Sequence, residues 1–209
     1  MALYHRYRPD RFDLVIGQEH ILRSLTNQIS LGRIAHAYLF CGPRGVGKTT
    51  MARLLAKAIN TPKDTSLFDS TSLEHSIDII EIDAASYTGV DHVREHIIEN
   101  AQFRPTQLAY KVFIIDEVHM LSTSAFNALL KMLEEPPKHV VSILATTELH
   151  KVPATIVSRC QRFLFRRVPM QEIIEQLQTI AQAESITIDP SLLTRIAARA
   201  DGSVRDAIM

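Results

Sequence analysis

Residues 42–49 combine three glycines with a lysine and a threonine in the order Gly-Pro-Arg-Gly-Val-Gly-Lys-Thr. This order fits the pattern G-x-x-x-x-G-K-[ST], whose glycines let the backbone fold around a diphosphate so that N–H groups point at its oxygens. We expect Lys48 to reach the β- and γ-phosphates and the Thr49 hydroxyl to ligate Mg²⁺. A glycine-rich turn without a ligand is the plainer alternative. The apolar run Ala37–Cys41 before the loop and the amphipathic helical pattern after it favour nucleotide binding.

Two acids follow a second apolar run. Val112–Ile115 has the composition of a buried strand, and Asp116 and Glu117 come directly after it. Ligands of open parallel sheets bind at the carboxyl ends of the strands, where these acids would lie. We expect Asp116 to hold Mg²⁺, directly or through water, and Glu117 to polarise the attacking water. Taken alone the pair is a weak signal, because two acids can also cap the following helix. With the phosphate loop upstream it becomes a strong one, and Glu117 favours ATP hydrolysis over a GTPase-like switch.

Two further residues could serve the same chemistry. Thr147 closes the next apolar strand, where a hydroxyl can sense the γ-phosphate or orient water, although an ordinary strand-end threonine is an equally good interpretation. Arg159 lies just past a helical stretch and could stabilise transition-state charge as an arginine finger. An isolated arginine is more often a surface or ion-pair residue, so both alternatives stay open at this point.

These residues need a scaffold, and the pattern of elements predicts one. Strand patterns at residues 37–41, 77–82, 111–115 and 140–145 alternate with helical patterns that include 90–101 and 124–135. Such alternation indicates an α/β fold with a parallel sheet flanked by helices. After Pro169 the patterns are helical only, at 171–184, at 190–200 and from Ser203 onward. We therefore expect a nucleotide-binding domain over residues 1–168 and a small helical lid domain, truncated at its end, over residues 169–209.

Composition limits the class of protein. Hydrophobic residues make up 46% of the 209 residues, and 23 basic residues balance 23 acidic ones. A net charge of zero argues against long-range attraction to nucleic acid, so a DNA contact must come from a local patch or a larger assembly. Two cysteines exclude a disulfide scaffold and a thiolate zinc site built from this chain alone. The sequence has no signal-peptide or bilayer-spanning pattern, and we expect a cytoplasmic protein with no membrane contact. The histidines show no metal-ligand spacing and are interpreted as surface or core residues.

A series of short motifs occurs in order along the whole chain: Tyr7-Arg8-Pro9, Val15-Ile16-Gly17-Gln18, the phosphate loop, Ile82-Asp83-Ala84-Ala85-Ser86, Asp116-Glu117-Val118-His119-Met120-Leu121, Phe126-Asn127-Ala128-Leu129-Leu130-Lys131, Glu134-Glu135-Pro136-Pro137, Ala145-Thr146-Thr147, Ser158-Arg159-Cys160 and Gly202-Ser203-Val204-Arg205-Asp206. Together they resemble the gamma/tau family of bacterial DNA polymerase III clamp-loader subunits, which are AAA+ ATPases. AAA+ proteins in general share only the phosphate loop and the acidic pair. The Ser-Arg-Cys element is typical of clamp loaders.

The resemblance implies a role for each matching position. It makes Asp116 the metal-side acid beside Thr49, Glu117 the catalytic base, and Thr147 the first sensor. Arg205 becomes the second sensor, which reaches the γ-phosphate from the lid. The implied nucleotide-binding positions are Tyr7, Arg8, Pro9, Val15 and Ile16 in the adenine-binding stretch, Gly42, Pro43, Arg44, Gly45, Val46, Gly47, Lys48, Thr49 and Thr50 in the phosphate loop, and Arg205.

The resemblance also implies partners. Arg159 would act in trans on ATP held by a neighbouring subunit, so a lone subunit should hydrolyse ATP poorly. ATP and Mg²⁺ would drive the opening of a sliding clamp and its loading onto primer–template DNA during replication. The implied protein partners are delta- and delta-prime-type subunits, further gamma/tau copies and the clamp. The family's collar domain is missing here, so we expect a monomeric fragment of a longer protein.

Two features depart from the family. Members carry a four-cysteine zinc module, but residues 60–76 hold no cysteine, so we predict no zinc. Some relatives carry basic residues facing DNA where this chain has Tyr87 and Gly89, and Arg94 alone matches a basic position, as a candidate DNA contact.

Two other functions share parts of this pattern. One is an ATP-inert stator of the same complex, which would have a degraded phosphate loop, whereas Gly47-Lys48-Thr49 is intact. The other is a different AAA+ motor, such as a Holliday-junction branch-migration helicase. That motor would share the ATP site but lack the Ser158-Arg159-Cys160 element, and clamp-dependent stimulation would separate the two.

Overall fold

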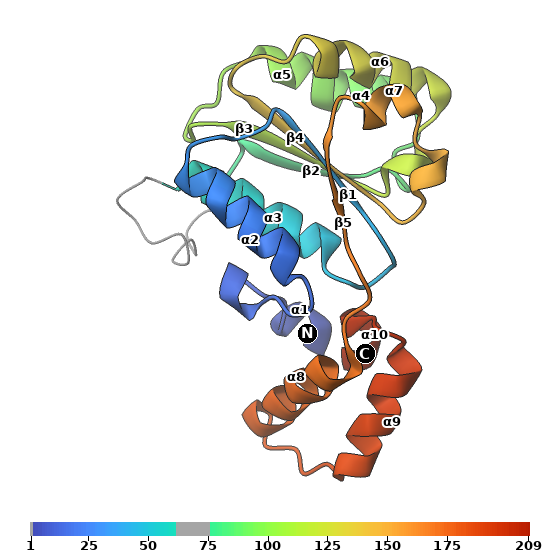
Figure 1. Ribbon diagram of the computed structural model, residues 1–209. Helices are drawn as coiled ribbons and strands as arrows, with labels where there is room; N and C mark the ends of the chain where they lie inside the picture. Colours follow the sequence, from blue (N-terminus) through green and yellow to red (C-terminus); the bar gives the residue numbers. More distant parts are fainter. Residues whose placement is uncertain (1, 62–75) are drawn as a thin grey trace.

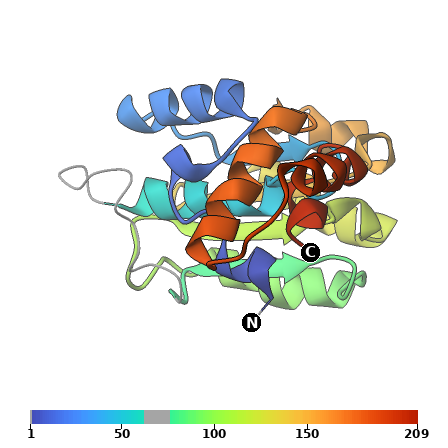
Figure 2. The same cartoon turned by 90° about the horizontal axis from the view of Figure 1, so that it is seen from below.

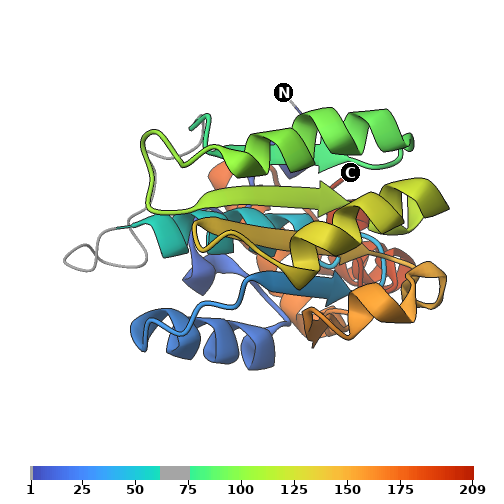
Figure 3. The ribbon, with the colours of Figure 1, turned by 90° about the horizontal axis from the view of Figure 1, so that it is seen from above.

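A computed structural model describes residues 2–61 and 76–209 of the chain. The described residues contain a sheet of five parallel strands in the order β2-β3-β4-β1-β5. The strands are β1 (Ala37–Cys41), β2 (Ile79–Asp83), β3 (Lys111–Asp116), β4 (Val140–Thr146) and β5 (Gln161–Leu164). Figure 3 shows the strands pointing the same way, so their carboxyl ends form one edge.

The apolar content of each strand explains which of them the sequence predicts, since the edge strand β2 has no fully buried residue but keeps an apolar sequence. Every residue of β1 and β4 is buried, as expected for central strands covered on both faces, and such strands have continuous apolar sequences. The edge strand β5 buries only Phe163 and exposes its other three residues. Its sequence, Gln-Arg-Phe-Leu, has no apolar run, so the sequence does not predict this strand.

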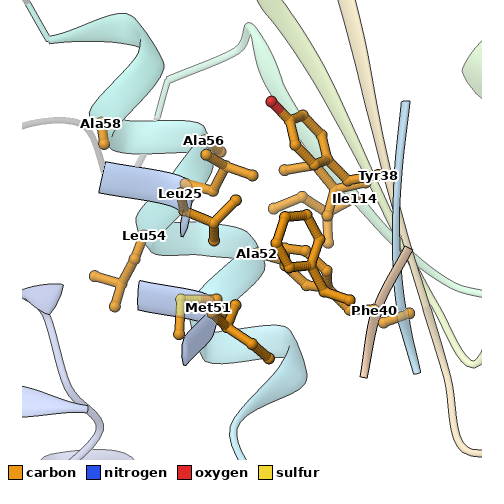
Figure 4. Packing of buried hydrophobic residues seen from close by; sticks show 14 of the residues in the cluster. Leu25, Tyr38, Phe40, Met51, Ala52, Leu54, Ala56, Ala58 and Ile114 are labelled. Atoms are coloured by element: carbon orange, nitrogen blue, oxygen red, sulfur yellow. The ribbon is translucent and has the colours of Figure 1, made fainter. Parts of the chain in front are cut away.

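Helices cover both faces of the sheet (Figure 1). One face packs against α2 (Glu19–Ser30) and α3 (Lys48–Asn60). The other packs against α6 (Thr123–Glu134), α7 (Ala154–Val157) and a helical stretch formed by α4 (Val90–Val93), the π-helical segment η3 (Arg94–Glu99) and α5 (Asn100–Gln102). Alternate residues of β1 serve the two faces: Tyr38 and Phe40 contact the α2–α3 cluster, shown in Figure 4, whereas Leu39 points to the α6 side.

Short helical turns complete this part of the chain. They are α1 (Leu3–Arg6), η1 (Phe12–Leu14), η4 (Val118–Met120) and η5 (Leu149–Lys151). Gln18, fully buried just before α2, donates from Nε2 to Arg166 O at 2.7 Å and accepts from Arg166 N at 3.1 Å. The Gly17-Gln18 motif therefore ties the N-terminal stretch to the segment that follows β5.

The last three helices have a hydrophobic cluster of their own. They are α8 (Met170–Ala183), α9 (Pro190–Ala200) and α10 (Val204–Ile208), and their buried side chains pack together with Val168. Helix α9 begins at the residue the sequence predicts, because the Asp189 carboxylate accepts from Ser191 N at 2.7 Å and Pro190 occupies the first helical position. We call residues 170–208 the lid.

One expectation bears on residues outside this description. The loop predicted over residues 60–76, and with it the predicted lack of zinc, falls largely on residues 62–75, which lie outside the described residues. Of the helices in the described ranges, none combines the length and the apolar character needed to cross a bilayer.

Asp78 lies just before β2 and joins the amino end of this strand to residues 106–108, which precede β3. Its side chain is buried and accepts hydrogen bonds from the backbone N–H groups of Thr106, Gln107 and Leu108 at 2.7–3.0 Å. Burial alone would raise the pKa of Asp78, but these donors and the nearby Lys111 ammonium outweigh it, so the pKa lies below its usual range.

We expect Asp78→Ala to lower the free energy of unfolding by about 2–4 kcal/mol, because three backbone donors lose their acceptor. Since the folded-state pKa of Asp78 is lowered, its stabilisation is present above the unfolded-state pKa of about 4 and disappears as the pH falls through the folded-state value. Denaturant unfolding at pH 7 and below pH 4 measures both effects. Asp78→Asn, which keeps one acceptor oxygen, should lose less. An Asp78→Ala chain with an unchanged unfolding midpoint at pH 7 would contradict this role.

Candidate nucleotide site

The phosphate loop joins β1 to α3 and has the backbone conformation its glycines predict. Gly45 and Gly47 have φ angles of +73° and +97°, in the left-handed region that other residues rarely adopt. Gly47 is the residue that caps α3, and the first N–H groups of a helix have no partner within it. The structure thus contains the strand–loop–helix backbone that residues 37–60 predict, and anion binding by the loop stays a prediction.

Lys48 is held inside this loop. Its side-chain nitrogen donates to Gly42 O at 2.9 Å and to Pro43 O at 2.7 Å, and the residue is buried. Burial lowers the pKa of Lys48, while the carboxylates of Glu117 and Asp116 oppose the shift. The ammonium is therefore pre-positioned at the loop, with two carboxylates on the other side of the cavity.

Thr49 and Asp116 meet across the sheet edge. Thr49 Oγ1 donates to Asp116 Oδ2 at 2.6 Å, and Asp116 is the last residue of β3. A hydroxyl and a carboxylate are the hard oxygen ligands that Mg²⁺ accepts, and Mg²⁺ commonly takes one or two such protein ligands together with substrate phosphates. The donor set therefore fits Mg²⁺, and the described residues contain no cluster of three or more His, Cys, Asp or Glu that would form a metal site without a nucleotide.

Glu117 lies in a turn whose backbone is unfavourable for its residue type. Its φ is +47°, in the left-handed region, which persists at such a position only when the surroundings fix it. The Thr147 hydroxyl donates to Glu117 Oε2 at 2.9 Å, and Thr147 N donates to the same atom at 3.3 Å. Because β4 lies between β1 and β3, its end brings Thr147 between the phosphate loop and the acids. Thr147 is therefore in contact with the predicted base.

A cavity of about 740 Å³ brings these groups together. Its lining includes almost every predicted nucleotide residue: Tyr7, Arg8, Pro9, Val15, Ile16, Pro43 to Thr50, Asp116, Glu117, Thr147 and Arg205. Gly42 is not in the lining, although its carbonyl accepts from Lys48. Burial lowers the pKa of Arg8, and the neighbouring Arg53 adds to this effect.

The lid closes one side of the cavity. Arg205 N donates to Gly45 O at 3.3 Å, and a Cβ added at Gly45 would overlap the Ser203 hydroxyl oxygen. The Arg205 guanidinium carbon lies 4.9 Å from the centre of the Tyr4 ring. Helix α1 also contacts the lid: Tyr7 OH donates to the Glu184 carboxylate, and Arg6 forms an ion pair with it at 2.8 Å. Figure 2 shows the N-terminal segment beside the lid helices.

Several lining residues were missing from the sequence-based site. They are Tyr4, Asp83, Ala85, His119, Met120, Val204 and Ile208. The spacing of Val204 and Ile208 around Arg205, one helical turn apart, could have placed them on the same helix face. His119 follows the acidic pair by two residues, but its sequence gives no sign that its side chain turns back into the cavity.

Two predicted residues lie elsewhere. Arg159 is absent from the cavity lining; its guanidinium pairs with Glu134 Oε1 at 2.6 Å and donates to Thr155 O at 2.8 Å. Arg94 is exposed on the π-helical segment, also away from the cavity. The single chain therefore does not bring Arg159 to its own predicted nucleotide site, and the DNA role of Arg94 stays a prediction.

Two family models match the chain. The model described as "DNA polymerase III, delta subunit" matches residues 17–169, and "DNA polymerase III clamp loader subunit, ATPase lid domain" matches residues 172–209. Among curated proteins, DNA polymerase III subunit tau of Bacillus subtilis is 51% identical over 99% of this chain and 38% of its own length. Subunit tau of Escherichia coli is 48% identical over 99% of this chain and 33% of its own length. The chain thus spans only about a third of these relatives.

Solved structures show the same fold. The Holliday junction branch migration motor RuvB of Thermotoga maritima superposes with a TM-score of 0.73, at 21% identity, over 97% of this chain and 63% of that chain. This likeness confirms the predicted α/β fold, and the ATPase lid model that matches residues 172–209 confirms the helical lid. At this level of identity it shows the fold alone, so it does not favour a branch-migration function.

We expect Gly45→Ala to separate the lid from the phosphate loop. The added methyl group would overlap the Ser203 hydroxyl, so α10 and Arg205 must move away, and the affinity for Mg-ATPγS should fall at least tenfold, which is about 1.4 kcal/mol. Calorimetric titration measures the affinity, and limited proteolysis of residues 165–169 should become faster.

Gly32→Ala is the matched control for backbone strain. Gly32 has a similar φ of +64°, and a Cβ there meets nothing within 4 Å. Both variants should lose about 1 kcal/mol of stability from the left-handed backbone. Equal nucleotide affinity in the two variants would refute the importance of the lid contact.

Proposed function

This chain belongs to the family of DNA polymerase III clamp-loader subunits that includes the gamma and tau proteins, and from this membership we propose that it is an ATP-driven motor subunit of a clamp loader. ATP binding and hydrolysis would open a sliding clamp and load it onto primer–template DNA during replication. The observation that carries the ATPase part is the single cavity that joins the phosphate loop, the Thr49–Asp116 pair and the Thr147–Glu117 pair.

The geometry supports a division of labour among these groups. The loop N–H groups and Lys48 would bind the β- and γ-phosphates, and Thr49 and Asp116 would hold Mg²⁺, which would neutralise phosphate charge. Glu117 accepts the proton of a water whose oxygen forms the new bond to the γ-phosphorus, while the bond from that phosphorus to the leaving ADP oxygen breaks. Thr147 orients Glu117, and Arg205 contacts the γ-phosphate from the lid.

The remaining assignments rest on the same family membership. Tyr7, Arg8, Pro9, Val15 and Ile16 line the side of the cavity proposed for adenine. Residues 1–168 form the nucleotide-binding domain and residues 169–209 the lid domain, and ATP favours one angle between them through Lys48 and Arg205.

The proposed partners are those of a clamp loader. They are delta- and delta-prime-type subunits, further gamma/tau copies, the sliding clamp and DNA, and the complex would work in the cytoplasm. Arg159 would serve a neighbour: about a third of its side chain is exposed, and its partner Glu134 is also accessible. A surface ion pair of this kind contributes at most about 1 kcal/mol, so a phosphate presented by a neighbour can replace Glu134.

Lys48→Ala tests the phosphate site. This substitution should weaken Mg-ATPγS binding by about 100-fold, or about 2.7 kcal/mol, because it removes the buried ammonium that two carbonyls of the loop hold in place. Calorimetry on the chain measures this, and Lys138→Ala, at an exposed lysine, should bind normally. Absence of binding by the unsubstituted chain would instead favour the ATP-inert stator, or a site that needs the assembled oligomer.

Arg159→Ala tests action in trans. We expect the variant to bind Mg-ATPγS normally, because Arg159 lies outside the cavity, and to lose turnover in the assembled complex by about 10³-fold. The measurement is steady-state ATP hydrolysis with clamp and primer–template DNA. Arg162→Ala, at an exposed arginine of β5, is the control. Normal turnover by the Arg159 variant would exclude the trans assignment, and lack of clamp-dependent stimulation in the unsubstituted complex would favour a different motor.

A further inference from the structure

His119 is a buried titratable residue at the cavity for which the proposed mechanism has no use. Its side chain is 6% exposed, and the residue lies in the turn η4, two positions after Glu117. Nδ1 lies 3.0 Å from Thr146 Oγ1 and 3.4 Å from Glu117 Oε2, and Nε2 lies 3.3 Å from Glu148 Oε1. The imidazole therefore bridges the turn that carries Glu117 and the end of β4 that carries Thr147.

The contacts of Glu117 are unevenly divided between its two carboxylate oxygens. The Thr147 hydroxyl, Thr147 N and His119 Nδ1 all approach Oε2. In the part of the chain that the structure describes, no hydrogen bond or ion pair involves Oε1. One oxygen is thus fixed by the protein, and the other is available to accept a proton from water.

The end of β4 is fixed by the same ring. Thr146 Oγ1 accepts from Glu148 N at 3.0 Å, and Thr146 is fully buried, so the hydroxyl facing His119 has little freedom to move. Glu148 is in turn paired with Lys151 at 2.8 Å. His119 Nδ1 thus faces both Thr146 at the end of β4 and the Glu117 carboxylate, whereas Nε2 faces Glu148.

We propose that His119 is a positioning residue that fixes Glu117 Oε2 and the end of β4 relative to each other, so that Glu117 Oε1 points at the attacking water. This inference rests on the proposed ATPase function. Glu117 depends on such support because its backbone lies in the left-handed region. Without the ring, Thr147 is the one described residue whose side chain still contacts that carboxylate, and the productive orientation becomes one of several.

Three substitutions at His119 distinguish the contribution of Nδ1 from that of Nε2. The amide nitrogen of His119→Asn can occupy the place of Nδ1, which faces Thr146 and Glu117. The amide of His119→Gln can occupy the place of Nε2, which faces Glu148. His119→Ala removes both. His139→Ala is the matched control. His139 is a half-buried histidine just before β4, outside the cavity lining, and its Nε2 lies 3.1 Å from Ala101 O.

The experiment measures kcat and KM for ATP in the complex assembled from the full-length protein with clamp and primer–template DNA, together with the Kd for Mg-ATPγS. We expect His119→Ala and His119→Gln to lower kcat by about tenfold or more, with KM and Kd changed less than about twofold, and His119→Asn to retain most of the turnover. His139→Ala should keep its kcat.

Three results would overturn the inference. One is an unchanged kcat in His119→Ala. Another is a parallel fall in kcat, in the affinity for Mg-ATPγS and in the melting temperature that His119→Asn does not rescue. That result would show that the ring only supports the fold. The third is an unsubstituted complex that does not hydrolyse ATP, which would also remove the proposed function, whereas the first two leave that function intact.

Discussion

The whole site depends on the parallel direction of the strands and on the place of β4 among them. Because the strands run the same way, the phosphate loop after β1, Thr147 after β4 and Asp116 at the end of β3 reach the same edge. The register pairs Cys41 with Thr146, so these two strands end level with each other. If β4 were not inserted between β1 and β3, Thr147 would not stand between the lysine of the loop and the acidic pair.

The charged and polar groups at this edge are held in place by contacts within the protein. Lys48 faces two carboxylates across the cavity, and its position is set by carbonyls of its own loop rather than by an ion pair. Asp116 is engaged by the Thr49 hydroxyl, and Glu117 by Thr147. Such preorganisation is what a phosphoryl-transfer site requires, since little covalent chemistry is left for the protein to do.

Much of this arrangement could be predicted from the sequence, and the exceptions have physical causes. The central strands are covered on both faces, so their apolar runs are visible, whereas the exposed edge strand β5 gives no such signal. The phosphate loop is a local motif, and its backbone matches the prediction. His119 was interpreted as a surface or core residue because its contacts with Thr146 and Glu148 join segments about 30 residues apart, which no spacing pattern reveals. Arg205 enters the cavity only because α10 returns to the loop, and that placement came from a resemblance and not from periodicity.

The N-terminal stretch has a mechanical consequence for the cavity. Its residues line the side of the cavity proposed for adenine. At one end, Arg6 and Tyr7 contact Glu184 of the lid. At the other end, Gln18 donates to the backbone of Arg166, in the segment between β5 and the lid. A rotation of the lid would therefore also move the N-terminal stretch, which borders the side of the cavity proposed for adenine. The same rotation would move α10 relative to the phosphate loop. The adenine and the terminal phosphate of a bound nucleotide would thus both contact segments that move with the lid. Both ends of the nucleotide would then help to set the angle between the lid and the rest of the chain.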